Sequence, residues 1–332
     1  MNNKSFTSSR QSGFTLIELM IAVMLGLLIV AGVIGVFLSN KQVYRQNENV
    51  ARLQESARYA KEIIYRDIRE AGGIACGSNL PTANVVNNPT ANWWSDWGEG
   101  IRGYEGTETL PAKATGTGTD ERVAGTDAVI VWRGDAASGV TIVSHDPPAA
   151  QFKVNTTAHG FTDGAVLLVC DLNQAAIFQV TNASDTNVTI VHNTGTEVPG
   201  NCSKGLGFPT DCSSVNGNPY TFAGGGIMSQ LASSAWYIGY NGRGGKSLYK
   251  ANSITSDEVA EGITDLQMKY LVVDSSGNLA SSYVDATSVT DWTLVVATRL
   301  VLTVETLENV GSDGLPITRT WNSVITLRNR RP

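Results

Sequence analysis

The feature that most constrains this chain is an apolar run from Leu19 to Leu38 in which no side chain is polar. Twenty residues of α-helix are about 30 Å long, which matches the hydrocarbon core of a bilayer. Glu18 stands directly before this run. A carboxylate in such a setting is costly, so it either meets a partner or reaches the lipid headgroups at the helix end. The run predicts a membrane-spanning helix over 19–38 with a functional carboxylate at its start.

The residues before the run decide its orientation and processing. Lys4 and Arg10 precede Gly13 and no acid does, so the leader is expected on the cytoplasmic side with the rest of the chain outside. A secretory signal peptide has its small-residue cleavage site after the apolar run, whereas here Gly13 comes before it. Cleavage after Gly13 would keep the helix on the mature chain. It would also give Phe14 a free amine, four residues from Glu18.

The junction from Gly13 to Glu18 reads Gly-Phe-Thr-Leu-Ile-Glu after a short basic leader, and it resembles the type IV pilin superfamily. The resemblance implies that residues 1–13 are a prepilin leader. It also implies that a prepilin peptidase cuts between Gly13 and Phe14 and methylates the new amine of Phe14. In such proteins Glu18 would meet the N-terminal amine of a neighbouring subunit during assembly.

Apolar residues continue beyond the run at helical spacing, which predicts one helix over 14–72 that ends at Gly72 and Gly73. Its first half needs lipid or neighbouring helices, and its second half offers a stripe on which a domain can pack. A single-pass anchor with a coiled-coil stalk would look similar. The pairs Ala22/Gly26 and Ala31/Gly35 permit close helix packing, although small residues are also common in membrane helices. The stripe consists of Val43, Val50, Leu53, Ala57, Ala60, Ile64 and Ile68.

Charge and cysteine usage indicate a domain outside the cytoplasm. The formal net charge is −6, and it becomes −8 without the two leader cations, which argues against nucleic-acid binding. All four cysteines follow the apolar run and none forms a Cys-x-x-Cys pair. In an oxidising compartment two disulfides are expected, with three possible connectivities. We favour Cys202–Cys212, which closes a short loop, and by elimination Cys76–Cys170.

The remainder of the chain predicts an α+β fold, with a long helix packed on an antiparallel β-rich domain over 73–332. Residues 73–126 are expected to form a long irregular connection with one short hairpin. Its tryptophans, Trp93, Trp94 and Trp97, either fold onto the domain and pin the connection or form an exposed contact patch. Strands are predicted at Ala128–Trp132, Val140–Val143, Ala165–Val169, Ala176–Thr181, Val188–His192, Ala235–Tyr240, Leu266–Val273, Leu294–Glu305 and Ile317–Leu327.

Motifs for catalysis and metal binding are weak. Gly245-Lys246-Ser247 resembles the end of a phosphate-binding loop, but the position of its leading glycine holds Tyr240, so the run is interpreted as a turn. The three histidines lack metal-ligand spacing. We therefore predict no enzyme activity, no cofactor and no metal. Arg328, Arg330 and Arg331 are expected to form a solvated C-terminal end, or to meet phospholipid or an acidic partner.

Blocks scattered along the chain narrow the resemblance to the PilW minor pilins: residues 65–72, 174–180, 235–240 and 327–330. This implies a minor pilin that takes part in priming type IV pilus assembly near the pilus tip. Its implied partners are other minor pilins, the major pilin, prepilin peptidase and the inner-membrane assembly platform. The chain would lie in the bacterial inner membrane with a periplasmic C-terminus, and then in the pilus at the cell surface. The alternatives are a minor pseudopilin of a type II secretion system and, from another class, a membrane-anchored binding domain or enzyme.

Overall fold

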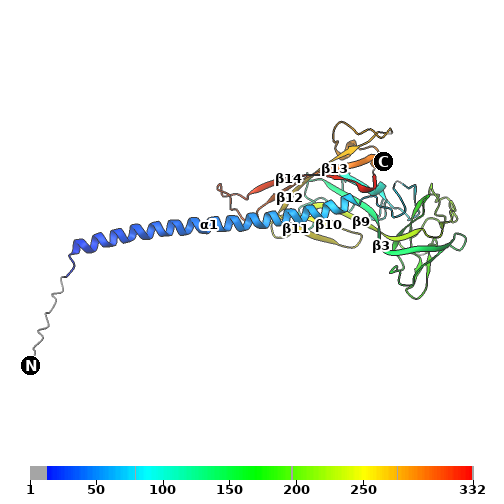
Figure 1. Ribbon diagram of the computed structural model, residues 1–332, viewed down its shortest axis with the longest axis horizontal. Coiled ribbons are helices and arrows are strands. Elements are labelled where there is room, and N and C mark those ends of the chain that lie inside the picture. Colours follow the sequence, from blue (N-terminus) through cyan, green and yellow to red (C-terminus); the bar gives the residue numbers. More distant parts are fainter. Residues whose placement is uncertain (1–12, 79, 196, 275, 331–332) are drawn as a thin grey trace, which may run out of the picture.

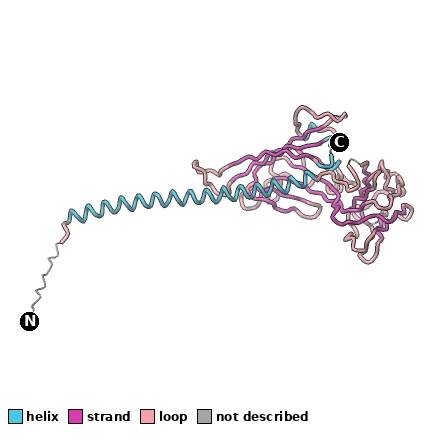
Figure 2. Tube along the Cα trace, viewed as in Figure 1, coloured by secondary structure: helices cyan, strands magenta, loops and turns pink. Residues whose placement is uncertain are grey.

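The computed structural model describes residues 13–78, 80–195, 197–274 and 276–330, so the leader residues 1–12 lie outside the described part. One helix, α1 (Leu16–Arg69), runs from the start of the described chain into the β-rich domain (Figures 1 and 2). Its 54 residues give it a length of about 80 Å. Gly72, with φ of +68°, follows the helix end in the left-handed conformation that glycine adopts most readily. The helix thus stops at the glycines that the sequence marks.

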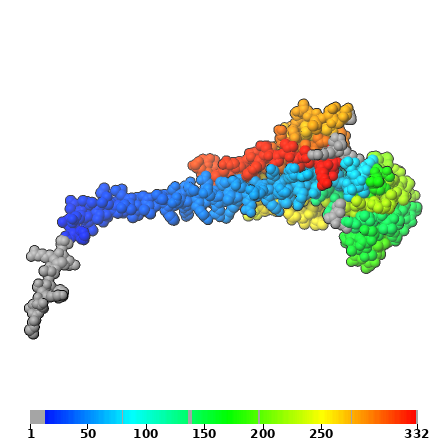
Figure 3. Space-filling view, in the orientation of Figure 1, coloured from blue at the N-terminus to red at the C-terminus, as the bar shows by residue number. Residues whose placement is uncertain are grey.

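The two halves of α1 lie in different surroundings. The half up to about residue 44 projects from the domain with its apolar side chains exposed (Figure 3), and the first contact with the domain is the ion pair between Arg45 and Glu308 at 2.6 Å. From Asn49 onward one face is buried against the domain, through Leu53, Ala57, Ala60, Ile64 and Ile68. The sequence stripe was placed too early along the helix, because Val43 is 51% exposed. Glu308 of the domain reaches back to Arg45, but Val43 stays uncovered.

A large mixed sheet forms the body of the domain. Its central strand β9 (Ile227–Tyr240) pairs antiparallel with β3 (Ala128–Asp146), β5 (Val166–Cys170) and β10 (Lys246–Ala251). β10 in turn pairs with β11 (Ser256–Glu261), and β5 pairs with β6 (Ala175–Gln179). The remaining strands of this sheet are β1 (Thr82–Asn84), β2 (Ile101–Tyr104), β4 (Gln151–Val154), β7 (Asn182–Ala183) and β8 (Thr189–Val191).

A second, three-stranded sheet follows in the sequence and contains β12 (Ile263–Val272), β13 (Val295–Glu305) and β14 (Thr318–Thr326). All its pairings are antiparallel. Alternate residues of β13, namely Leu300, Leu302 and Val304, are buried, which is the pattern expected of a strand with one face on the core. β14 runs beside α1 (Figure 3). Short 3-10 helices lie in the described chain at Gly98–Gly100, Ala286–Ser288, Trp292–Leu294 and Arg328–Arg330.

Three apolar cores hold these layers together. The first lies between the buried half of α1 and the two sheets, and it includes Ile64, Trp236 and Leu302. The second lies on the opposite face of the large sheet around Trp132 and Tyr237. The alternation within β9, where Trp236 faces the first core and Tyr237 the second, separates them. The third core fills a distal lobe made by β4, β8 and the far end of β3, together with the face of β5 and β6 that is turned away from the second core. The predicted α+β class is confirmed.

Several local predictions need correction. Within the described residues 73–78 and 80–126 no two strands form a hairpin: β1 pairs parallel with β6 and β2 pairs antiparallel with β3, so both extend the large sheet. The strands predicted at 128–132 and 140–143 are parts of the single long strand β3. β4, β7, β10 and β11 were missed, because their sequences are short or polar. Trp93, Trp94 and Trp97 are partly buried against the second core, so they pin the long connection to the sheet.

Covalent and polar contacts fasten the end of α1 to the domain. The structure contains both disulfides in the favoured pairing, Cys76–Cys170 and Cys202–Cys212. The first joins the segment just after the helix to β5. Nδ2 of Asn329 donates hydrogen bonds to the carbonyl oxygens of Glu70 and Ala71, at 3.2 and 3.3 Å. The predicted solvated C-terminal end is right for Arg328, which is exposed, and wrong for Arg330, which is buried, whereas Arg331 lies outside the described residues.

Candidate functional site

The start of α1 carries the residues that the sequence singled out for processing and assembly. Gly13 and Phe14 precede the helix, and the Phe14 side chain is 90% exposed. Thr15 is the N-cap residue, and its hydroxyl oxygen accepts from the backbone N–H of Glu18 at 3.3 Å. The Glu18 carboxylate accepts in return from the backbone N–H and the hydroxyl of Thr15, both at 2.9 Å. These contacts form a reciprocal capping box.

The capping box was not foreseen, although Thr15-Leu16-Ile17-Glu18 is the spacing that predicts one. It shows how a single chain keeps a carboxylate at the edge of an apolar helix. Two donors from Thr15 stabilise the charge, and the negative side chain lies at the positive end of the helix dipole. The arrangement holds Glu18 at the helix start, on the side of the cut site. It leaves the carboxylate exposed and without a cation within the described residues.

The small residues proposed for helix packing lie in the projecting half of α1. An added Cβ atom at Gly26 or Gly35 would meet nothing within 4 Å in the chain itself. At about 100° per residue, Ala22/Gly26 and Ala31/Gly35 lie about 180° apart around the helix axis. Each pair is therefore open on its own side of the helix. The geometry permits close approach of two different helices, one on each face.

A second polar site lies at the other end of α1, where Asp67 is 1% exposed on the face that packs against the large sheet. Its carboxylate is 2.7 Å from Nζ of Lys250 on β10 and 3.4 Å from Nη1 of Arg133 on β3. It also accepts a hydrogen bond from Nε1 of Trp236 on β9 at 3.1 Å. Nζ of Lys250 stacks 5.2 Å from the ring centre of Trp236. One helix carboxylate thus fixes three strands against α1.

The sequence interpretation missed Asp67, although a signal was present. Asp67 follows Ile64 by three residues and precedes Ala71 by four, so it occupies a position on the apolar stripe. A carboxylate at such a position is buried when the stripe packs, and it then needs cations or donors from the domain. Asp67 fixes the last turns of α1 on the domain, whereas Gly13, Phe14 and Glu18 lie at the opposite end of the helix.

The distal lobe contains a buried histidine pair. Nε2 of His145 lies 3.1 Å from Nε2 of His192, and Phe152 stacks on the His145 ring at 3.9 Å between centroids. Burial lowers the pKa of His145 to about 4 and the pKa of His192 to about 3, so both are neutral near pH 7. Across the described residues, no group of three or more His, Cys, Asp and Glu is placed to hold a metal ion. The pair serves as part of an aromatic core.

Comparison with known families defines the chain in two steps. Residues 8–34 match the prokaryotic N-terminal methylation motif, which covers the end of the leader, the cut site and the apolar run as far as Ile34. This match, with the long helix and the β-rich domain, is consistent with a type IV pilin-like fold. Residues 235–327 match the family Type IV Pilus-assembly protein W, from the second half of β9 to the end of β14. Together the two matches support a PilW-type minor pilin. No curated protein and no solved structure matches the chain.

The two matched regions agree with the geometry. Within the described residues, α1 is the one helix whose length and hydropathy would suit a membrane span, and its most apolar window is not buried by the domain. The methylation motif and this helix support membrane anchoring and association with a pilus. Both matched families are pilin or pilus-assembly families. The matches leave residues 35–234 uncovered, and this stretch contains the distal lobe.

Proposed function

We propose that this chain is a minor pilin that primes type IV pilus assembly at the bacterial inner membrane and stays near the pilus tip. The observation that carries the proposal is the projecting half of α1. It is a fully apolar helix that the chain's own domain leaves uncovered, with one carboxylate at its start. Such a surface is stable in lipid or among similar helices, and both environments occur along the route from membrane to pilus.

In this proposal prepilin peptidase cuts between Gly13 and Phe14 and the new amine of Phe14 is methylated. Glu18 then changes partner. In the single chain its carboxylate accepts from Thr15, and in the assembled bundle it pairs with the Phe14 amine of an adjacent subunit. Because an unpaired charge is costly in an apolar environment, this pairing favours the axial register in which the two groups meet. The two small-residue pairs allow the neighbouring helices to approach from both sides.

The partners follow from the same surfaces. Other minor pilins and the major pilin would cover the apolar helix, and the inner-membrane assembly platform would receive it after processing. The domain over 73–332 would be periplasmic before assembly and at the cell surface afterwards. Both disulfides and the acidic exterior suit that location.

The test compares Glu18→Ala, Glu18→Gln and Glu18→Asp in the native host, with retraction blocked so that only assembly is scored. We expect membrane insertion and leader cleavage to stay normal, whereas pilus number and recovery of the variant in sheared pili fall. Glu18→Gln should resemble Glu18→Ala because the charge is lost. Glu18→Asp should recover little because its side chain is shorter by one methylene.

Thr15→Val is the matched control, because it removes the hydroxyl of the capping box and keeps the Glu18 carboxylate. If Glu18 acts between subunits, Thr15→Val assembles pili almost normally. If Glu18 serves only as a helix cap, Thr15→Val and Glu18→Ala have the same defect. Wild-type piliation in all Glu18 variants would contradict the proposal and favour an anchored domain of another function.

A further inference from the structure

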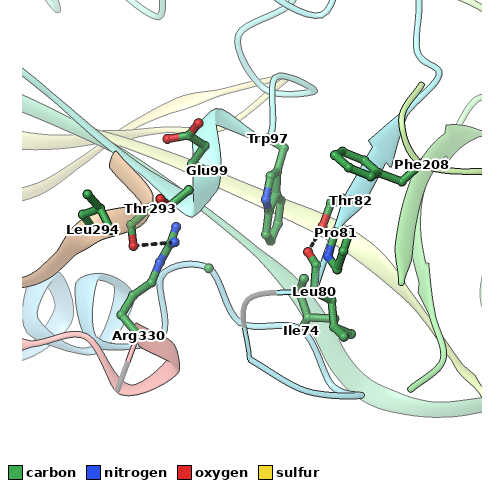
Figure 4. A pocket seen from close by; sticks show the side chains of 11 residues that line it. Ile74, Leu80, Pro81, Thr82, Trp97, Glu99, Phe208, Thr293, Leu294 and Arg330 are labelled. Atoms are coloured by element: carbon green, nitrogen blue, oxygen red, sulfur yellow. Dashed lines mark hydrogen bonds between the residues drawn. The ribbon is translucent and has the colours of Figure 1, made fainter. Parts of the chain in front are cut away.

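A cavity of about 540 Å³ lies at the waist of the molecule, where the end of α1, the long connection, the distal lobe and the C-terminal segment meet (Figure 4). Its volume is within the range of small-ligand sites. Apolar and aromatic side chains form one side, and a cation is buried on the other. The residues that matter for the argument are Ile74, Leu80, Trp97, Phe208, Glu99 and Arg330.

Arg330 is the unusual member, because it is only 8% exposed and carries a full charge. One guanidinium nitrogen, Nη1, donates to the carbonyl oxygen of Thr293 at 3.0 Å. No carboxylate oxygen of the described chain lies within 4.0 Å of the Arg330 guanidinium; Glu99 and Asp291 act on it from farther away. Burial lowers the pKa of Arg330, which reflects the cost of removing this cation from water. A buried guanidinium without a counter-ion favours binding of an anion.

The end of the helix does not supply the missing partner. Asn329 already donates to the carbonyl oxygens of Glu70 and Ala71. The guanidinium instead lies over two glycines in left-handed conformations: a Cβ atom at Gly72 would be 3.4 Å from Nε, and one at Gly100 would be 3.4 Å from Nη2. This packing holds the guanidinium at the wall of the cavity, beside Thr293 and Glu99 (Figure 4).

The remaining walls suit an apolar body attached to the anion. Trp97 stands between Arg330 and the side formed by Leu80 and Phe208 (Figure 4). Phe208 is 51% exposed, so an aromatic surface is open at this side of the cavity. The exposed Glu99 and the negative end of the α1 dipole oppose a doubly charged anion such as phosphate. A single carboxylate matches the planar donor geometry of arginine and adds less repulsion.

We propose that the waist cavity binds a carboxylate joined to an apolar or aromatic body, with Arg330 holding the carboxylate and Trp97 and Phe208 contacting the body. The carboxylate could belong to a free small acid or to an acidic residue within an apolar peptide segment. This inference is independent of the role of Glu18 and of pilus priming.

The test uses the full chain in detergent and measures binding by isothermal titration calorimetry. The probes are 3-phenylpropionate and its neutral isostere 3-phenylpropionamide. We expect the carboxylate to bind at least about tenfold more tightly than the amide, because a charge-assisted hydrogen bond is lost in the amide. Arg330→Met should remove this difference, and Phe208→Ala, at a half-exposed position, should weaken both probes.

A peptide arm identifies the source of the carboxylate. Acetyl-Phe-Glu-Phe-amide is compared with acetyl-Phe-Gln-Phe-amide under the same conditions. Tighter binding of the Glu peptide than of 3-phenylpropionate supports the proposal with a polypeptide ligand, and the reverse order supports it with a free small acid. Equal binding of acid and amide probes, or no binding of either at about 10 mM, overturns it. If Arg330→Met does not fold, Arg330→Lys replaces it, with the expectation of weaker carboxylate binding and unchanged amide binding.

Discussion

Ile29 and Ile64 are the same residue type on the same helix, and they differ only in what surrounds them. The Ile29 side chain is 67% exposed in the projecting half of α1, whereas Ile64 is fully buried in the first core. Burial of apolar surface contributes about 25 cal/mol per Å², so the buried half is stabilised by the chain's own domain. The projecting half gains this free energy only from lipid or from other subunits. One continuous helix thus has a half that the chain's own domain stabilises and a half that needs lipid or other subunits to cover its apolar surface.

The largest expected effect comes from the disulfide that follows the buried half. Cys76 and Cys170 are 94 residues apart, so opening this bond with Cys76→Ala and Cys170→Ala should lower the free energy of unfolding by about 4.7 kcal/mol. The matched control is Cys202→Ala with Cys212→Ala. Its 10-residue separation predicts a loss of about 2.7 kcal/mol. Chemical denaturation followed by tryptophan fluorescence measures both. A larger loss of unfolding free energy for the control would contradict the expectation that the Cys76–Cys170 disulfide stabilises the chain at the end of α1.

The next effect tests the two halves of α1 directly. Ile64→Ala should destabilise the domain by about 2–5 kcal/mol, because it leaves a cavity between the helix and the sheets. Ile29→Ala makes the same chemical change in the projecting half and should leave domain unfolding in detergent unchanged. Equal losses of unfolding free energy for the two substitutions would contradict the view that only the buried half of α1 stabilises the domain.

A smaller effect is expected at the polar contact of the buried half. Asp67→Asn keeps the size of the side chain and an acceptor for Trp236, but it leaves Lys250 and Arg133 without their buried anion. We expect a loss of about 2 kcal/mol, less than for a fully buried pair because both cations are partly exposed. Glu70→Gln is the control, since Glu70 pairs with Arg133 at 3.3 Å near the surface and should contribute less than about 1 kcal/mol. A zero effect of Asp67→Asn would assign the contact no role in docking the helix.

The sequence predicted the parts of the fold that follow from local pattern. The apolar run, the stripe through Ile64, the glycines after the helix and the alternation in β13 each specify an element by themselves. The pairing of Cys202 with Cys212 also followed from their short loop, and it left Cys76–Cys170 by elimination. These features depend on neighbours in the sequence, so a single chain reveals them.

The parts that were missed depend on contacts distant in sequence. β1 and β2 are too short to show a period and form only because β6 and β3 offer edges for pairing. The burial of Arg330 depends on Gly72 and Gly100, which are 258 and 230 positions away along the chain. Asp67 and the capping box at Thr15 were local and could have been predicted from their spacing. The assembly roles of Gly13, Phe14 and Glu18 concern other molecules, so the fold of one chain leaves them as proposals.

The most direct test is to determine the N-terminal residue of this chain after it has been recovered from sheared pili of the native host. Mass spectrometry of its N-terminal peptide should show a chain that begins at Phe14 and carries one methyl group on the amine, with the apolar helix retained. Gly13→Val should prevent cleavage and exclude the chain from pili. Recovery of assembled chain that still carries the leader through Gly13 would contradict the claim that the projecting half of α1 is a processed pilin helix.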